Sequence, residues 1–161
     1  MNPESMRIVD RLAETLDHDG VAFEIIPHRR SESALAEAKA IGISADDVAK
    51  TVVLVSDRGF VRALVPASRR LDVRKLAALF EQRRDFRLAT EAELAAAYRG
   101  FELGAVPPLG GPGDDCVVLD RRLADRYSVV VEAGTHDESV RLRTRDIVIE
   151  GDAMIADICE D

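Results

Sequence analysis

A lysine at the start of an apolar run is the first feature of this sequence that could do chemistry. Lys50 precedes Thr51 and the four apolar residues 52–55, and only Lys39 and Lys75 among the other basic residues are lysines. A compact ammonium can bind a phosphate or stabilise a developing oxyanion as a point charge, and its pKa responds to burial. Lys50 is therefore a catalytic candidate, although on composition alone a lysine that only snorkels at the end of a buried strand is the more common case.

A glycine- and proline-rich loop, Gly104–Gly113, is the second candidate. Its prolines restrict the backbone, and its glycines allow a ligand to approach the main chain closely. The amides near Gly104 and Ala105 could then point at a carbonyl or phosphate oxygen. A rigid connector without a binding role explains the same composition equally well.

Other catalytic signatures are absent from the sequence. It has no dinucleotide- or phosphate-binding glycine motif and no Gly-x-Ser-x-Gly elbow. Cys116 and Cys159 fit no redox or catalytic signature, so we expect buried thiols in preference to a disulfide. His18, His28 and His136 show no ligand spacing, so we expect no metal and no other cofactor. A hydrolase built from these residues would hold a labile ester beside a water molecule, with backbone donors and one lysine stabilising the charge.

Length and charge restrict the class of protein. A chain of 161 residues with 47% apolar content suits a single domain, residues 1–161, in which residues 1–20 form an N-terminal helix packed on the remainder. The formal charge of −8 argues against DNA and against broad nucleic-acid binding, but not against a local contact by a basic doublet such as Arg69-Arg70. No apolar stretch approaches the roughly 18 residues of a membrane helix, and the N-terminus lacks a secretory pattern. We therefore expect a cytoplasmic protein with no membrane partner.

The periodicity of apolar residues predicts both helices and strands. The predicted helices cover residues 4–16, 34–41, 45–49, 73–80 and 91–98. The predicted strands cover residues 21–26, 51–55, 60–65, 116–119, 128–131, 140–142 and 154–158. Ser33, Asp72 and Thr90 are suited to cap helices, Gly42 to end one, and Gly59 to complete a hairpin turn. Because no strict βαβ repeat appears, the order favours an α+β or mixed α/β domain over a doubly wound sheet.

Several segments occur in an order that resembles a known family. In chain order they are His28 with Ser33 and Ala38, Ala49–Val53, Arg70–Leu76, Arg87–Leu94, Gly100–Pro108 and Val117–Asp120. This pattern resembles the YbaK/prolyl-tRNA-synthetase-associated domain family of trans-editing aminoacyl-tRNA deacylases, from about Val21 to the C-terminus. Its most specific part is a lysine before an apolar strand, followed later by Gly-x-x-x-Pro. The resemblance implies a mixed, barrel-like sheet flanked by helices, and it implies no metal.

The same resemblance implies a set of site residues. Lys50 matches the family's essential lysine, which is placed to engage the terminal nucleotide of the tRNA and the reacting ester. Residues 104–108 match the loop that shapes the aminoacyl pocket, and the segment near residue 134 falls where the family has another pocket-lining stretch. The expected substrate-binding residues are His28, Thr51, Gly104, Ala105, Val106, Pro107, Pro108, Gly134 and His136.

The implied activity is hydrolysis of the ester of a mischarged tRNA, often the tRNA for proline carrying cysteine or alanine. A stiff loop suits a pocket that admits a small side chain and rejects a larger one. Recruitment by prolyl-tRNA synthetase, which binds the same tRNA, would make a broad cationic face unnecessary. The alternative is a non-catalytic module of the same fold that binds tRNA or a synthetase. A small-molecule hydrolase or binding protein is less favoured, and the oligomeric state stays open.

Overall fold

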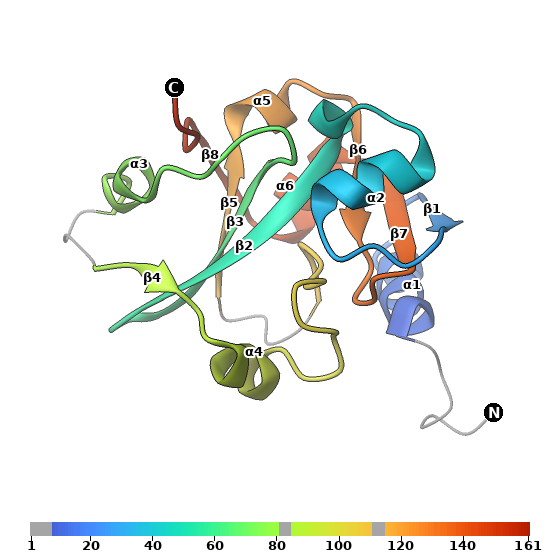
Figure 1. Ribbon diagram of the computed structural model, residues 1–161, viewed down its shortest axis with the longest axis horizontal. Helices are drawn as coiled ribbons and strands as arrows, with labels where there is room; N and C mark the ends of the chain where they lie inside the picture. Colours follow the sequence, from blue (N-terminus) through green and yellow to red (C-terminus); the bar gives the residue numbers. More distant parts are fainter. Residues whose placement is uncertain (1–7, 81–84, 111–114) are drawn as a thin grey trace.

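Eight strands form one mixed sheet in the computed structural model, which describes residues 8–80, 85–110 and 115–161 (Figure 1). The strands are β1 (Phe23–Pro27), β2 (Val48–Ser56), β3 (Gly59–Pro66), β4 (Arg87–Leu88), β5 (Cys116–Asp120), β6 (Ser128–Glu132), β7 (Glu138–Arg143) and β8 (Met154–Ala156). The helices are α1 (Ile8–His18), α2 (Ala34–Ile41), the 3₁₀ helix η2 (Ala45–Asp47), α3 (Val73–Ala77), α4 (Glu91–Ala97), α5 (Arg121–Ala124) and α6 (Thr144–Glu150). This mixed sheet flanked by helices confirms the predicted fold class.

The strand order places β2 at the centre of the sheet. The order is β1-β7-β6-β2-β3-β5-β8, and β4 pairs with β2 outside this path. The hairpin of β2 and β3 is antiparallel over eight register pairs, from Ala49↔Pro66 to Ser56↔Gly59. Strand β6 runs parallel to β2, but the two pair at only two positions, Val48↔Val130 and Ala49↔Val131. The two strands therefore separate directly after Ala49.

Several helix ends form where capping residues were predicted. The Ser33 side chain accepts a hydrogen bond from the amide of Ala36, and Gly42 ends the same helix in the left-handed conformation with φ 84°. Asp72 caps α3 through two main-chain amides. Thr90 opens α4 with a complete capping box. These local signals confirm the predicted starts of α2, α3 and α4.

Other predicted boundaries were wrong. The helix expected over 45–49 stops at Asp47, because Val48 and Ala49 are fully buried and pair with β6. Helix α3 and strand β8 are shorter than predicted, and α5, α6 and β4 were not predicted. Residues 4–7 of the predicted first helix lie outside the described residues. No described helix is long and apolar enough to span a membrane.

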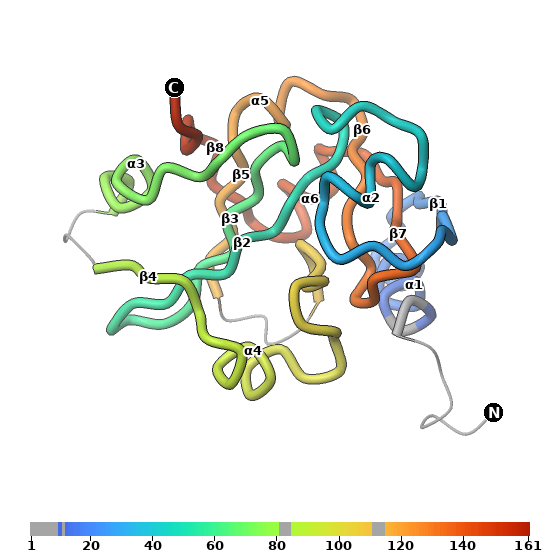
Figure 2. The backbone as a smooth tube through the Cα atoms, in the orientation of Figure 1, coloured from blue at the N-terminus to red at the C-terminus, as the bar shows by residue number. Residues whose placement is uncertain are grey.

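The helices pack on both faces of the sheet. On β6, Val129 and Val131 pack in a cluster with residues of α1 and α6, whereas Val130 packs with residues of α2. Since side chains alternate along a strand, α2 covers one face, and α1 and α6 cover the other. A smaller cluster, built around Val53, Tyr98 and Val106, joins β2 to α4 and to the segment that follows it. Figure 2 shows this segment rising from α4 towards the turn that joins β6 to β7.

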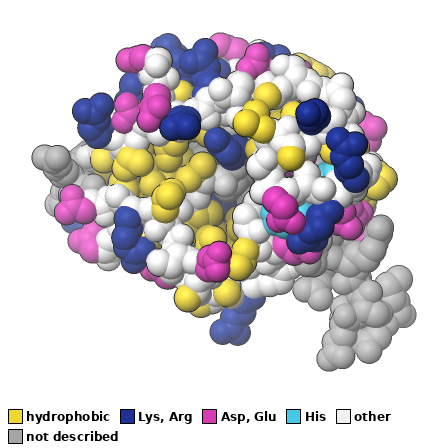
Figure 3. All heavy atoms as spheres, viewed as in Figure 1, with side chains coloured by type: hydrophobic (Ala, Val, Ile, Leu, Met, Phe, Trp, Pro, Cys, Tyr) yellow, Lys and Arg dark blue, Asp and Glu magenta, His cyan; other side chains and the backbone are white. Residues whose placement is uncertain are grey.

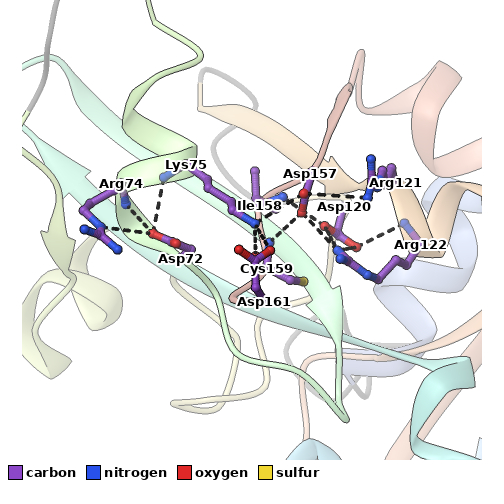
Figure 4. A network of polar contacts seen from close by, with 10 residues as sticks. All are labelled: Asp72, Arg74, Lys75, Asp120, Arg121, Arg122, Asp157, Ile158, Cys159 and Asp161. Atoms are coloured by element: carbon purple, nitrogen blue, oxygen red, sulfur yellow. Dashed lines mark hydrogen bonds and ion pairs between the residues drawn. The ribbon is translucent and has the colours of Figure 1, made fainter.

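The C-terminal segment is held by ion pairs and hydrogen bonds (Figure 4). Lys75 contacts the carboxylates of Asp157 and Asp161 and donates to the carbonyl of Cys159 at 2.7 Å. Both cysteines are free, as expected; Cys159 is buried and Cys116 is half-buried. Burial raises the pKa of the Cys159 thiol to about 12, so it stays protonated at neutral pH. Lys75 therefore has a structural explanation, unlike Lys50.

Candidate functional site

A gap in strand pairing along one edge of β2 forms the floor of a cavity. Strand β6 occupies the start of this edge, at residues 48 and 49, and β4 occupies its end, at residues 54 and 55. Among the described residues, no strand pairs with residues 50–53 on that side. The cavity has a volume of about 360 Å³, which lies within the range of small-molecule sites. Its lining residues are Glu32, Ser33, Ala34, Lys50, Thr51, Val52, Val53, Leu88, Ala89, Leu94, Gly104, Val106 and Glu132.

Main-chain groups of Thr51 point towards this gap. The carbonyl of Val48 accepts from Ala67, beyond β3, whereas the carbonyl of Val53 accepts from Ala89, beyond β4. Because main-chain groups of an antiparallel strand point to alternate edges, Thr51 shares the orientation of Val53. Its N–H and C=O therefore face the cavity edge.

Lys50 lies at one wall of the cavity, and among the described residues it forms no ion pair with a carboxylate. Its Nζ donates to the carbonyl of Arg69 at 3.1 Å, which uses one of its three donor hydrogens. Burial lowers the pKa of Lys50, and the positive charge of Arg70 lowers it further, whereas Cys159 acts in the opposite direction. The ammonium is thus partly desolvated, and within the described part of the chain only the Arg69 carbonyl engages its donor hydrogens.

The loop after α4 contributes Gly104 and Val106 to the lining of the cavity. Arg62 on β3 holds this loop: its Nη1 donates to the carbonyl of Pro107 at 2.9 Å, and its Nη2 donates to Asp115 at 3.0 Å. The hydroxyl of Tyr98 donates to the same carboxylate at 2.6 Å. Because these groups are buried, their contacts hold the loop rigidly against β3.

Three of the predicted loop residues lie behind the cavity surface. Ala105, Pro107 and Pro108 are buried and are not among the lining residues. The amide of Ala105 donates to the carbonyl of Glu102 at 3.0 Å. The expectation that this amide points at a substrate oxygen was therefore wrong. Gly111, Pro112 and Gly113 of the predicted loop lie outside the described residues.

The segment containing Gly134 and His136 supports the loop and does not line the cavity. Glu102 donates its amide to the carbonyl of Gly134 at 2.7 Å, and its carboxylate accepts from the amide of His136 at 2.8 Å. The Nε2 of His136 is 2.6 Å from the carbonyl of Leu103 and donates to it, since a carbonyl can only accept. A Cβ at Gly104, where φ is 80°, would contact the His136 ring at 3.5 Å. His136 is thus the surface against which the loop packs.

His28 also lies outside the cavity lining. Its Nε2 is 2.8 Å from the hydroxyl of Ser139, which also hydrogen-bonds the buried carboxyl of Glu37. Burial raises the pKa of Glu37 to about 7, against the opposing effect of the hydrogen bond from Ser139. His28 therefore belongs to a buried polar set next to α2. The structure brings Lys50, Thr51, Gly104 and Val106 together, and the roles of all these residues stay predictions.

Sequence reasoning missed an acidic residue at the cavity wall. Glu132, the last residue of β6, is 8% exposed and lines the cavity. Burial raises its pKa to about 9, with further contributions from Glu37, Glu102 and Glu32. The sequence contains a signal for this residue: Glu132 is a charged residue directly after the apolar residues 129–131, just as Lys50 is a charged residue at the start of an apolar run.

The described residues contain no cluster of potential metal ligands, and the polar groups that line the cavity are hydrogen-bonding and charged side chains and main-chain groups. Its chemistry is therefore that of an ammonium, a carboxyl and main-chain donors facing a small apolar space. Figure 3 shows hydrophobic side chains gathered over the front face along β2, with Lys and Arg side chains at its margins.

Comparison with known proteins identifies similar sequences and folds. The profile of the aminoacyl-tRNA editing domain matches residues 28–148. A crystal structure provisionally named a trans-editing enzyme for prolyl-tRNA synthetase is 25% identical, with a TM-score of 0.86 over 100% of this chain and 99% of that chain. A structure from work on grafting epitope backbones onto scaffold proteins is 23% identical, with a TM-score of 0.85 over the same shares of the two chains. A provisionally named signal transduction protein from Marinobacter aquaeolei VT8 is 21% identical, with a TM-score of 0.68 over 98% of this chain and 31% of that chain. No curated protein matches the sequence.

Proposed function

The chain belongs to the aminoacyl-tRNA editing domain family, and from this premise we propose that it is a deacylase that hydrolyses the ester of mischarged tRNA in trans. The observation that carries the proposal is that Lys50 and the loop residues Gly104 and Val106 line one cavity. A cation and a rigid loop in one cavity are what an ester needs if it is to be held beside a water molecule.

The proposed reaction uses the substrate's own reactivity. A water molecule attacks the ester carbonyl carbon, and negative charge develops on the carbonyl oxygen. The Lys50 ammonium stabilises this charge, and the Thr51 amide, at the unpaired edge of β2, is placed to donate to the same oxygen. The bond from carbon to the ribose oxygen then breaks, and the vicinal ribose hydroxyl relays the proton from the water to the leaving oxygen.

The apolar walls support selection of a small amino acid. Val53, Leu94 and Val106 line the cavity, and Val53 and Val106 belong to the cluster around Tyr98. Since these residues and the loop are packed from behind, the cavity cannot easily widen for a larger side chain. Alanine or cysteine on the tRNA for proline is our proposed substrate, with proline itself excluded by size.

The tRNA backbone has a candidate contact beside Lys50. Arg69 and Arg70 follow β3, and among the described residues neither guanidinium forms an ion pair. We place a phosphate near the acceptor end of the tRNA at this doublet, because guanidinium groups bind phosphates in a bidentate manner. Such a local contact is compatible with the net charge of −8. Prolyl-tRNA synthetase, which binds the same tRNA, is the partner that we propose delivers the mischarged tRNA.

The proposal is tested with a panel of labelled aminoacyl-tRNAs. Purified protein is mixed with alanyl-, cysteinyl- and prolyl-tRNA for proline, and loss of the ester is followed against the uncatalysed rate. We expect hydrolysis of the first two esters and survival of the third. Lys50→Ala should remove activity, whereas the exposed lysine substitution Lys39→Ala, on α2 and outside the cavity lining, should retain it.

Two results would contradict the proposal. Survival of every ester in the panel would reject the deacylase assignment, and saturable binding of tRNA or synthetase without turnover would instead favour a non-catalytic module. Equal activity of Lys50→Ala and the wild-type protein would show that the cavity is not the reaction site.

A further inference from the structure

The carboxyl of Glu132 lacks the arginine partner that the buried acids Asp115 and Asp120 have. Asp115 is paired with Arg62, and Asp120 with Arg122. Among the described residues, no Lys or Arg forms an ion pair with Glu132, and no hydrogen bond reaches its carboxyl. The Nδ1 of His136 lies 3.7 Å from Oε2 of Glu132. A buried carboxyl that lines a cavity without a partner is a typical ligand-binding group.

The surroundings of Glu132 contain more acceptors than donors. Nε2 of His136 donates to the carbonyl of Leu103, and Nδ1 has no hydrogen-bond partner. Glu32 lines the same cavity, and Glu37 and Glu102 add negative charge nearby. The nearby cation Arg30 is already paired with Glu32 and Glu102. A ligand that brings a positive charge and N–H donors would complete this wall.

We propose that Glu132 binds the α-ammonium group of the aminoacyl ester, an inference that rests on the deacylase function proposed above. In the bound complex the ammonium lies against the Glu132 carboxylate, and the ester carbonyl turns towards Lys50. The substrate has its positive group and its developing negative oxygen on adjacent carbons. The cavity has a matching carboxylate, Glu132, and a matching cation, Lys50, on two strands that separate after Val131 and Ala49. The two side chains together fix the direction in which the ester enters.

The consequence is a specificity for free aminoacyl esters. An ester whose nitrogen is acylated, as in a peptidyl group, brings no ammonium and adds bulk beside a buried carboxyl. An α-hydroxyacyl ester has nearly the same shape as an aminoacyl ester but no positive charge. Both should be poorer substrates, because neither offers the charge-assisted contact that would offset ionisation of the buried Glu132 carboxyl.

The test compares three esters on one tRNA: alanyl, lactyl and N-acetylalanyl. Each kcat/KM is divided by the uncatalysed hydrolysis rate of the same ester, which removes the intrinsic effect of the ammonium on lability. For the wild-type protein we expect a preference of about 10- to 100-fold for alanyl over lactyl, the size of a charge-assisted contact. Glu132→Gln preserves the shape of the side chain and should reduce this preference to within about threefold.

Glu138→Gln is the matched control, since Glu138 is also a buried glutamate, on the neighbouring strand β7, but does not line the cavity. It should keep the alanyl preference. A wild-type measurement that needs no variant adds an independent readout: titration with a non-hydrolysable alanylamido-adenosine and its lactoylamido counterpart should show tighter binding of the first.

The outcomes separate this inference from the function on which it rests. Hydrolysis of alanyl and lactyl esters with equal normalised rates, or an unchanged preference in Glu132→Gln, would overturn the role of Glu132 and leave the deacylase intact. Failure to hydrolyse any ester would overturn the deacylase. In that case equal binding of the two adenosine analogues would also reject ammonium recognition, and preferential binding of the alanyl analogue would support it.

Discussion

Lys50 and Glu132 occupy equivalent positions on two parallel strands, each one residue beyond the last register pair, Ala49↔Val131. Because side chains alternate along a strand, both lie on the face of the sheet that carries Val48 and Val130, which is the face covered by α2. Beyond this point the strands diverge, and both side chains line the same cavity. The separation of two strands thus creates a site with a cation on one side and an acid on the other.

The burial of Lys50 predicts a specific pH dependence of activity. The mechanism needs the charged ammonium, and burial lowers the pKa of Lys50 from its ordinary value of 10.5. The value of kcat/KM, corrected for uncatalysed ester loss, should therefore begin to fall at a lower pH than an exposed lysine would allow. Lys50→Arg should abolish this alkaline limb, because a guanidinium does not lose its proton in this range. Identical pH profiles for the two proteins would exclude Lys50 as the titrating group.

The raised pKa of Glu132 predicts that stability falls as pH rises. The folded protein keeps this proton up to about pH 9, whereas the unfolded chain loses it near the ordinary value of 4.5. Unfolding therefore releases a proton between these limits, and the free energy of unfolding decreases across the window. Glu37, with its pKa raised to about 7, acts in the same direction over the lower part.

Glu132→Gln should remove the upper part of this pH dependence. At pH 8 we expect the variant to be more stable than the wild-type protein by about 4 kcal/mol, with little difference at pH 4.5. Urea unfolding at several pH values measures the change. Parallel pH profiles for the two proteins would show that Glu132 is already ionised in the folded state.

The left-handed conformation of Gly104 predicts a loss of both stability and activity on substitution. Gly104 has φ 80°, and Gly42, at the end of α2, has φ 84°. Alanine at either position should destabilise the fold by about 1 kcal/mol, because a side chain strains this conformation. Only Gly104→Ala should also reduce deacylation, by about tenfold, since Gly104 lines the cavity and relief of its backbone strain would move the cavity wall. Equal deacylation activities of the two variants would show that the conformation of the loop does not affect catalysis.

The buried pair of Arg62 and Asp115 predicts a large effect of a small substitution. Asp115→Asn removes the charge that balances a guanidinium only 3% exposed, and should cost about 3 kcal/mol of unfolding free energy. Glu24→Gln, which breaks the exposed pair of Glu24 and Arg141, should cost less than about 0.5 kcal/mol. Chemical denaturation gives both values. Similar costs for the two variants would show that Arg62 does not depend on its partner.

The apolar wall predicts that a larger cavity will relax selectivity. Leu94→Ala removes a branched side chain that lines the cavity from α4. Prolyl-tRNA should then become a substrate, while alanyl-tRNA hydrolysis changes little, because one or two methylene groups decide exclusion in such a pocket. The ratio of the two kcat/KM values measures the effect. Continued survival of prolyl-tRNA would place the sieve elsewhere in the cavity.

Local signals in the sequence predicted those parts of the fold that depend on local interactions. Ser33, Gly42 and the capping box at Thr90 act within one or two helical turns, and the β2–β3 hairpin closes through its own turn. Val48 and Ala49 were assigned to a helix because only their pairing with β6, about 80 residues later, makes them a strand. Long-range pairing of this kind leaves no local pattern.

The distinction between local signals and long-range contacts also applies to the candidate site. Lys50 and the Gly104 loop stand out by composition, and the structure places them on one cavity. The support given by His136 to Gly104, and by Arg62 to Pro107, depends on contacts between distant segments. Glu132 directly follows the predicted strand 128–131, and only the separation of β6 from β2 after Val131 turns its position into a cavity wall. A charged residue at the end of an apolar strand is the local feature that it shares with Lys50.

The interrupted edge of β2 has a consequence for behaviour at high concentration. Exposed strand edges commonly recruit further strands from other molecules and so lead to aggregation. Here the free stretch is only residues 50–53, closed at one end by β6 and at the other by β4. An incoming chain would have too few consecutive partners to form a ladder, whereas a compact ligand needs only one or two of them. The protein can therefore present backbone groups to a small guest without becoming a template for polymerisation.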